Sequence, residues 1–172
     1  GLNLRVSARL SGQLLHCITS ITPRARYFSF FPWCIAEFNR REKVENPTSS
    51  LREAIRLREK ALTLGCVIHH GGEACDGGSL VGSSQAITWL EKHSGETPKL
   101  SKLSFTKNPA LDAYFNSLVH LGFFVTDDEH REEIETEEAP QVVVSELELT
   151  PLGQRVAAAY GAAVGNLPVV TK

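Results

Sequence analysis

Residues 108–125, NPALDAYFNSLVHLGFFV, and residues 141–160, QVVVSELELTPLGQRVAAAY, decide the fold. In the first stretch, apolar side chains recur at the 3.6-residue spacing of one helix face: Leu111, Tyr114, Phe115, Leu118 and Leu121. This spacing predicts a helix over 109–121 that runs into a strand, with Asp112, Asn116, Ser117 and His120 facing outward. The second stretch predicts a strand that runs into a closing helix.

Two shorter helices are expected upstream, in SSQAITWLEKHSG (83–95) and in KLSKLSFTKN (99–108). The resulting order is helix, short helix, helix, strand, loop, strand, helix. It resembles a winged helix-turn-helix domain, which we expect over 84–165 with a tail at 166–172. The predicted fold class is therefore mainly α with a small β-wing, preceded by an N-terminal helical region.

The loop between the two strands carries the opposite charge from a DNA-binding wing. Residues 127–138, DDEHREEIETEE, hold eight carboxylates and one arginine, a net charge of −7. Duplex DNA is bound by cations that release condensed counterions, so this loop is expected to be repelled by DNA. It favours docking of a basic protein partner instead. The candidate docking residues are Asp127, Asp128, Glu129, Glu132 and Glu133.

The 109–121 helix is poorly equipped to read DNA sequence. Base edges are contacted mainly by Arg, Lys, Asn or Gln, and of its outward residues only Asn116 belongs to that group. Lys99, Lys102 and Lys107 stand just upstream and could contact phosphates. A DNA-binding regulator that uses these four residues is the alternative to protein docking.

The N-terminal part is basic and aromatic. Residues 1–60 hold eleven Lys and Arg against five Glu. In residues 18–43, ITSITPRARYFSFFPWCIAEFNRREK, we expect a helix capped by Thr22, with Pro23 in its first turn and an end near Lys43. Pro32 is expected to kink or restart that helix. Its dense aromatic residues indicate a core and an interface, and Arg24 and Arg26 are candidate nucleic-acid ligands.

A further helix, LREAIRLREKALTLG, is expected at 51–65, capped by Ser49 or Ser50 and closed by Gly65. Arg52 and Arg56 lie among its exposed charges and are also candidate nucleic-acid ligands. These two arginines repel each other, and Glu53 and Glu59 offset part of that repulsion. The N-terminal helical region is then 1–65, including an apolar helix in 4–18. The glycine-rich stretch 66–83 is the predicted linker.

Cofactor and metal signals are weak. Cys66, His69, His70 and Cys75 are zinc-ligand types at a short spacing, but paired C-x2-C knuckles are absent and the glycine-rich loop more readily turns than coordinates. Four irregularly placed cysteines do not form a disulfide framework. We find no catalytic or phosphate-loop motif and no targeting segment. No cofactor, no membrane association and a cytoplasmic location are expected. A glycine start and no methionine suggest a piece of a longer chain.

Residues 12–42, GQLLHCITSITPRARYFSFFPWCIAEFNRRE, resemble the opening of an uncharacterised bacterial domain family with the block LFPG-T-x-x-T-x-RARYYxFxPW. The matching positions are Ile18, Thr22, Arg24, Ala25, Arg26, Tyr27, Phe28, Pro32 and Trp33, and the basic helix with Arg52, Arg56 and Arg58 is similar too. The chain departs from the block at His16 and Cys17, where the family has Pro-Gly. The resemblance covers about the first 65 residues. It implies a bacterial protein found among DNA-handling or phage-defence genes, and it carries over no catalytic residue.

The leading functional hypothesis is a non-catalytic adaptor or scaffold subunit of such an assembly, with a protein partner and possible contact with nucleic acid. One alternative is the DNA-binding winged-helix regulator. A second is an accessory part of a larger nuclease-associated protein. No small-molecule substrate is indicated.

Overall fold

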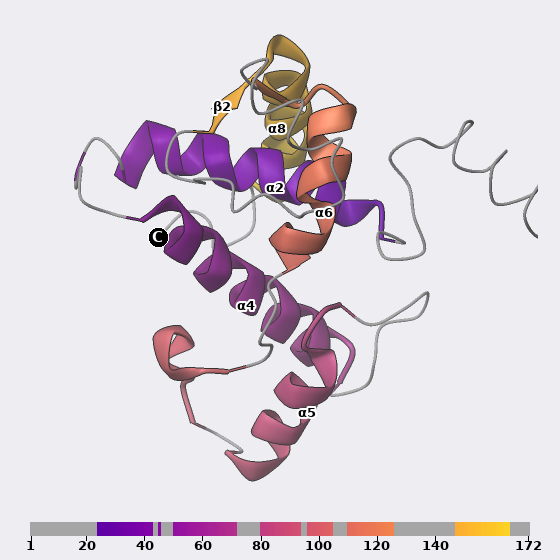
Figure 1. Cartoon of the computed structure of the whole chain (residues 1–172). Coiled ribbons are helices and arrows are strands. Elements are labelled where there is room, and N and C mark those ends of the chain that lie inside the picture. Colours follow the sequence, from indigo (N-terminus) through magenta and orange to yellow (C-terminus); the bar gives the residue numbers. More distant parts are fainter. Residues whose placement is uncertain are drawn as a thin grey trace, which may run out of the picture.

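A computed structural model describes residues 24–42, 45, 50–71, 80–93, 96–104, 110–125 and 147–165 (Figure 1). These residues are mainly helical, with one two-stranded antiparallel sheet, as the sequence predicts at that level. The elements are α2 (Arg26–Glu37), the π-helix η1 (Phe38–Glu42), α4 (Leu51–His69), α5 (Ser83–Lys92), the 3-10 helix η2 (Leu100–Lys102), α6 (Ala110–His120), β1 (Phe124–Val125), β2 (Glu148–Leu149) and α8 (Pro151–Val164). None of the described helices is both long and apolar enough to cross a lipid bilayer.

Helix α2 lies at the centre of the main core. Its aromatic side chains are buried between α4, α6 and α8, with Tyr27 stacked on Phe31 at a centroid distance of 5.2 Å. Such rings remove large apolar areas from water, so truncating one to alanine costs about 3–5 kcal/mol. The prediction that this cluster builds a core is confirmed. The helix passes through Pro32 and does not restart there; the expected cap at Thr22 lies outside the described residues.

Helix α4 is longer than the sequence predicts. It starts as expected, with Ser50 Oγ accepting a hydrogen bond from the Glu53 backbone N–H. The expected end at Gly65 is wrong, because the helix continues to His69. Gly65 does not have the positive φ of a glycine that ends a helix, whereas Gly71 does, with φ of 68°. The additional turn contains Val67, which is buried together with Leu64 of the preceding turn. This burial stabilises the extension of the helix.

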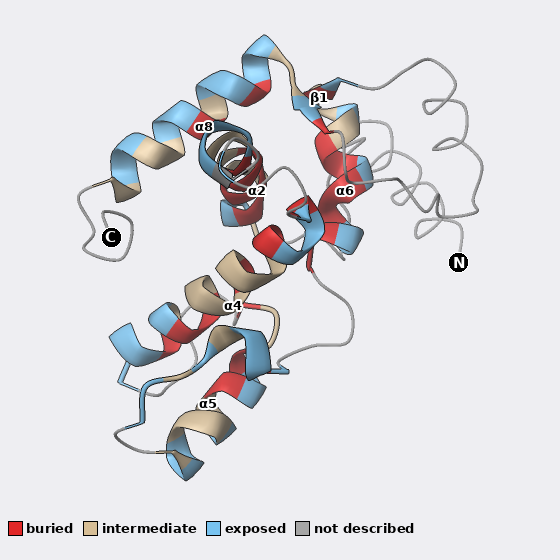
Figure 2. Cartoon of the chain, turned by 90° about the vertical axis from the view of Figure 1, so that its left-hand side faces the viewer, coloured by how far each residue is buried: buried red, intermediate tan, exposed pale blue. Residues whose placement is uncertain are grey.

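Two groups of buried side chains share α4. The larger, which we call the main core, joins the first half of α4 to α2, α6, β1 and the residues around β2 and α8. The smaller is built from Leu64 and Val67 of α4 with Ala86 of α5 and Leu103 after η2. Both views place α5 on one side of α4 and α6 on the other (Figures 1 and 2). The domain boundaries at 65 and 84 stay a prediction, although the main core draws residues from both sides of them.

The strand pair ties α6 to α8. Phe124 stands opposite Leu149, and Val125 stands opposite Glu148. Thr150 caps α8 by accepting a hydrogen bond from the Gly153 N–H at 3.1 Å, and its hydroxyl donates to the carbonyl of Gly122. The Thr150 N–H donates to the carbonyl of Phe123 at 3.0 Å. The start of α8 is therefore held directly against the chain that leaves α6.

Candidate functional site

The exposed face of α6 is the first part of the site. Helix α6 has buried and exposed faces (Figure 2). Asp112, Ala113, Asn116 and His120 are exposed, while Leu111, Tyr114, Phe115 and Leu118 are buried as predicted. The expectation that Ser117 faces outward is wrong, since its side chain is buried beside this apolar face. The helix contains no lysine or arginine. Its exposed face is therefore small, polar and without a cation.

The N-terminal end of α6 is bound by two side chains of α4. The carboxylate of Glu59 accepts a hydrogen bond from the Ala110 N–H at 2.9 Å, and this N–H belongs to the first residue of α6. Two residues further along α6, both carboxylate oxygens of Asp112 accept a hydrogen bond from Nη2 of Arg52, at 2.8 and 2.9 Å. Helix N-termini carry unsatisfied N–H groups and a partial positive charge that attract anions. Here a carboxylate of the protein itself occupies that position.

The burial of Glu59 was missed from the sequence, which placed it among the exposed charges. Only 4% of its surface is accessible to solvent. Burial raises the pKa of this carboxyl group and Asp112 adds to the rise, while the Ala110 hydrogen bond and Arg56 act against it. A signal was present: Glu59 follows Leu51 and Ile55 at four-residue intervals, which puts all three on the same face of a helix.

Arg24 and Arg26, the N-terminal candidates for nucleic-acid binding, lie at the start of α2. The backbone N–H of Arg24 donates to the Tyr114 hydroxyl at 2.9 Å, and within the described part of the chain its buried Nε has no hydrogen-bond partner. Arg26 is exposed, and its Nη1 lies 3.6 Å from Sγ of Cys66. Both residues stand at the start of α2. The structure thus joins this end of α2 to α6 and to the last turns of α4.

The remaining predicted cations are spread out as well. Arg56 is half-buried on α4, while Lys99 and Lys102 are exposed at η2. Residues of η2 pack with α5 in the smaller core and not with α6. Lys107 and the acidic docking residues Asp127, Asp128, Glu129, Glu132 and Glu133 lie outside the described residues. Lys99 and Lys102 therefore stand beside the smaller core, whereas Asn116 stands on a helix of the main core.

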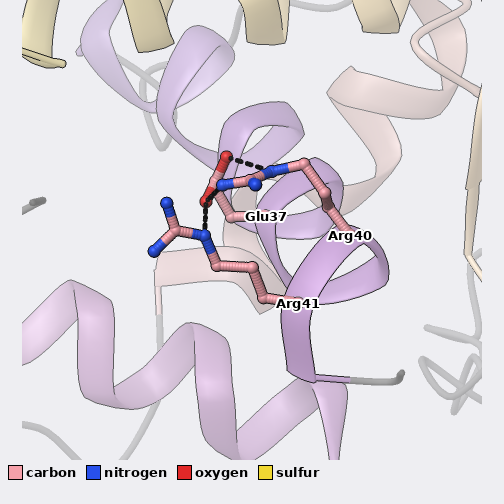
Figure 3. A network of polar contacts seen from close by, with 3 residues as sticks. All are labelled: Glu37, Arg40 and Arg41. Atoms are coloured by element: carbon pink, nitrogen blue, oxygen red, sulfur yellow. Dashed lines mark hydrogen bonds and ion pairs between the residues drawn. The ribbon is translucent and has the colours of Figure 1, made fainter. Parts of the chain in front are cut away.

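Two further arginines stand in η1, directly after α2. Arg40 and Arg41 both pair with Glu37, at 2.7 and 3.3 Å (Figure 3). Exposed pairs of this kind contribute little to stability, because water and salt screen them. The single carboxylate of Glu37 is thus shared by two guanidinium groups.

The predicted zinc ligands do not form a site in the described part of the chain. Cys66 and His69 lie in the last turns of α4 and His70 follows directly, with the two imidazole rings 5.2 Å apart and edge-on. No group of three or more His, Cys, Asp or Glu residues among those described is placed to hold a metal ion. Cys75 lies outside the described residues.

Comparison with models of protein families, with curated proteins and with solved structures finds no match for this chain.

Proposed function

We propose that this chain is a non-catalytic adaptor that binds a protein partner through a winged-helix-like module. The module consists of α2, α4, α6, β1, β2 and α8, which follow the order helix, helix, helix, strand, strand, helix and share the main core. In this proposal α5 and η2 are an insertion between the second and third helices. This differs from the domain expected over 84–165, in which α5 was the first helix.

The proposal rests on the N-terminal end of α6, which is already bound by side chains of α4. In helix-turn-helix proteins, the second helix of the motif reads bases with residues near its N-terminus. At the corresponding place in this module, Glu59 binds the Ala110 N–H and Asp112 is paired with Arg52. A carboxylate at each of these points opposes the approach of DNA phosphates. It does not oppose the approach of a protein surface.

The surface beside α6 also suits a protein partner. Val125 of β1 and Leu152 of α8 are exposed to 49% and 39%, and with Ile68 of α4 at 56% they are the exposed large apolar residues in the described part of this chain. Apolar side chains bordered by polar groups are typical of protein interfaces. The assembly in which the adaptor acts, among DNA-handling or phage-defence proteins, rests on the resemblance of residues 12–42.

A photo-crosslinking experiment tests the proposal. A photoreactive amino acid replaces Asn116 on the exposed face of α6, and a matched variant carries it at Gln85, which is exposed on α5. After irradiation in the cells that produce the protein, we expect an adduct at position 116 that protease removes and nuclease leaves intact. Position 85 should give much less of it. A nuclease-sensitive adduct at position 116 would contradict the proposal.

The alternative, a DNA-binding regulator, is supported by the exposure of Lys99 and Lys102. It is separated from docking by titrating duplex DNA at physiological salt. We expect weak binding that disappears as salt rises, because few phosphates would be neutralised. A tight, sequence-specific complex that is lost on Lys102→Glu and on Lys107→Glu would establish the alternative.

A further inference from the structure

Glu59 is a buried carboxylate that the proposed docking does not use. It lies between Ile55 and Thr63 on the inward face of α4, where apolar residues would be expected. Its hydrogen bond to the Ala110 N–H joins the middle of α4 to the first residue of α6. Because β1 follows α6 directly, this contact also bears on the position of the strand pair and α8.

Among the described residues, the groups that influence Glu59 come from three helices. From α2, the buried hydroxyl of Tyr27 is close enough for its pKa to be raised in part by Glu59, although its own burial is the larger cause. The carboxylate of Asp112 on α6 raises the pKa of Glu59 by charge repulsion, and the half-buried guanidinium of Arg56 on α4 lowers it. Asp112 and the loss of water favour a neutral Glu59. The Ala110 N–H and Arg56 favour an ionised one.

We propose that Glu59 makes the junction between α4 and α6 sensitive to protons: protonation stabilises the packed junction by removing a buried charge, and deprotonation destabilises it. We call this device the Glu59 latch. A protonated carboxyl group still accepts the Ala110 N–H through its carbonyl oxygen, and it no longer carries a buried charge. The latch goes beyond the proposed function, because it operates whether the partner is a protein or a nucleic acid.

The sign of the effect follows from the direction of the shift. Burial raises the pKa of Glu59 in the folded chain above its usual value of 4.5. Between those two values the folded protein holds a proton that the unfolded chain has released. The contribution of the latch to stability is therefore complete below the usual value and is lost as pH rises through the raised one.

A comparison of two glutamine variants tests the latch. Glu59→Gln supplies a neutral group of nearly the same shape, and Glu91→Gln makes the same change at an exposed position on α5. Urea unfolding is followed from pH 4 upward. In wild type and in Glu91→Gln, we expect the unfolding constant to rise by up to about tenfold per pH unit within the window. That rise should be absent in Glu59→Gln, and parallel profiles in all three proteins would overturn the proposal.

Measurements on the wild-type protein decide the matter even if Glu59→Gln does not fold. Carbon-detected NMR of the side-chain carboxyl group should show Glu59 titrating above the usual value for glutamate. Over the same pH range, hydrogen exchange at the Ala110 N–H, corrected for its intrinsic pH dependence, should become less protected as Glu59 ionises. Titration at or below the ordinary value, or protection that is independent of pH, would refute the latch.

Discussion

Gly153 is the point where α8 touches the backbone that leaves α6, and replacing it with alanine should destabilise the protein. An added Cβ would lie 2.2 Å from the carbonyl oxygen of Phe123, 3.1 Å from its carbonyl carbon and 3.2 Å from Cδ2 of Leu149. Ordinary van der Waals contact begins at 3.4 Å, so α8 or the Phe123 peptide must move by about 1 Å. Phe123 cannot yield easily, because its carbonyl also accepts the Thr150 N–H.

The size of the effect follows from three contributions. Overpacking a fixed contact typically costs about 1–3 kcal/mol. A displaced α8 also weakens the Thr150 cap, whose full loss costs about 1 kcal/mol. Alanine instead of glycine in a helix offsets at most about 1 kcal/mol of this. We expect a net loss of about 1–3 kcal/mol, measured as the free energy of unfolding in urea.

Gly161 provides the matched control on the same helix. A Cβ there would meet Cδ1 of Trp33 at 3.4 Å, which is a side chain that can shift slightly. Gly161→Ala should therefore leave stability unchanged or raise it by up to about 1 kcal/mol through helix propensity. The reasoning is refuted if Gly153→Ala is as stable as wild type, or if the two variants lose the same amount.

Three further outcomes are expected. Gly65→Ala should raise the free energy of unfolding in urea by about 0.5–1 kcal/mol, because nothing lies within 4 Å of the added methyl group and the residue is inside α4; a loss would restore Gly65 as a helix end. A double-mutant cycle with Arg52→Ala and Asp112→Ala should give a coupling free energy of about 0.2–1 kcal/mol that decreases as salt rises. A coupling of zero at low salt would mean that this ion pair does not help to hold α6. Burial raises the pKa of Tyr160 to about 12, so stability should fall as pH rises from the usual 10 to that value. The fall should be shallower in Tyr160→Phe, and equal slopes would contradict the shift.

The elements that the sequence predicted well are those with a strong local signal. The period of apolar residues placed α6, and the aromatic density around Phe31 marked the main core. The end of α4 was misplaced, because a glycine is a stop signal only where the backbone adopts a positive φ. That conformation occurs at Gly71 and not at Gly65. The packing of α4 on α5 keeps the chain helical past Gly65.

The candidate site was only partly predictable for a related reason. Asn116 and Asp112 were placed on the exposed face by helical period alone. The polar partners of the N-terminal end of α6 come from α4, 51 residues away in the case of Glu59 and Ala110, and no local pattern encodes such a contact. The four-residue spacing puts Glu59 on the same helix face as residues that are buried, a signal that the prediction did not use. Its charge led to the opposite assignment, because glutamate is almost never fully buried unless it is paired.

That buried carboxylate links the two inferences about this chain. Replacing Glu59 by an apolar residue would avoid the loss of hydration, and replacing it by glutamine would keep the hydrogen bond without the charge. In the two proposals, a charge held at the N-terminal end of α6 would have two effects that neither substitute would have. It would exclude phosphate from the place where a duplex-reading helix binds it, and it would make the stability of the junction between α4 and α6 depend on a proton. Protein docking and the Glu59 latch can nevertheless fail separately, because crosslinking at Asn116 reports the partner and urea unfolding reports the proton.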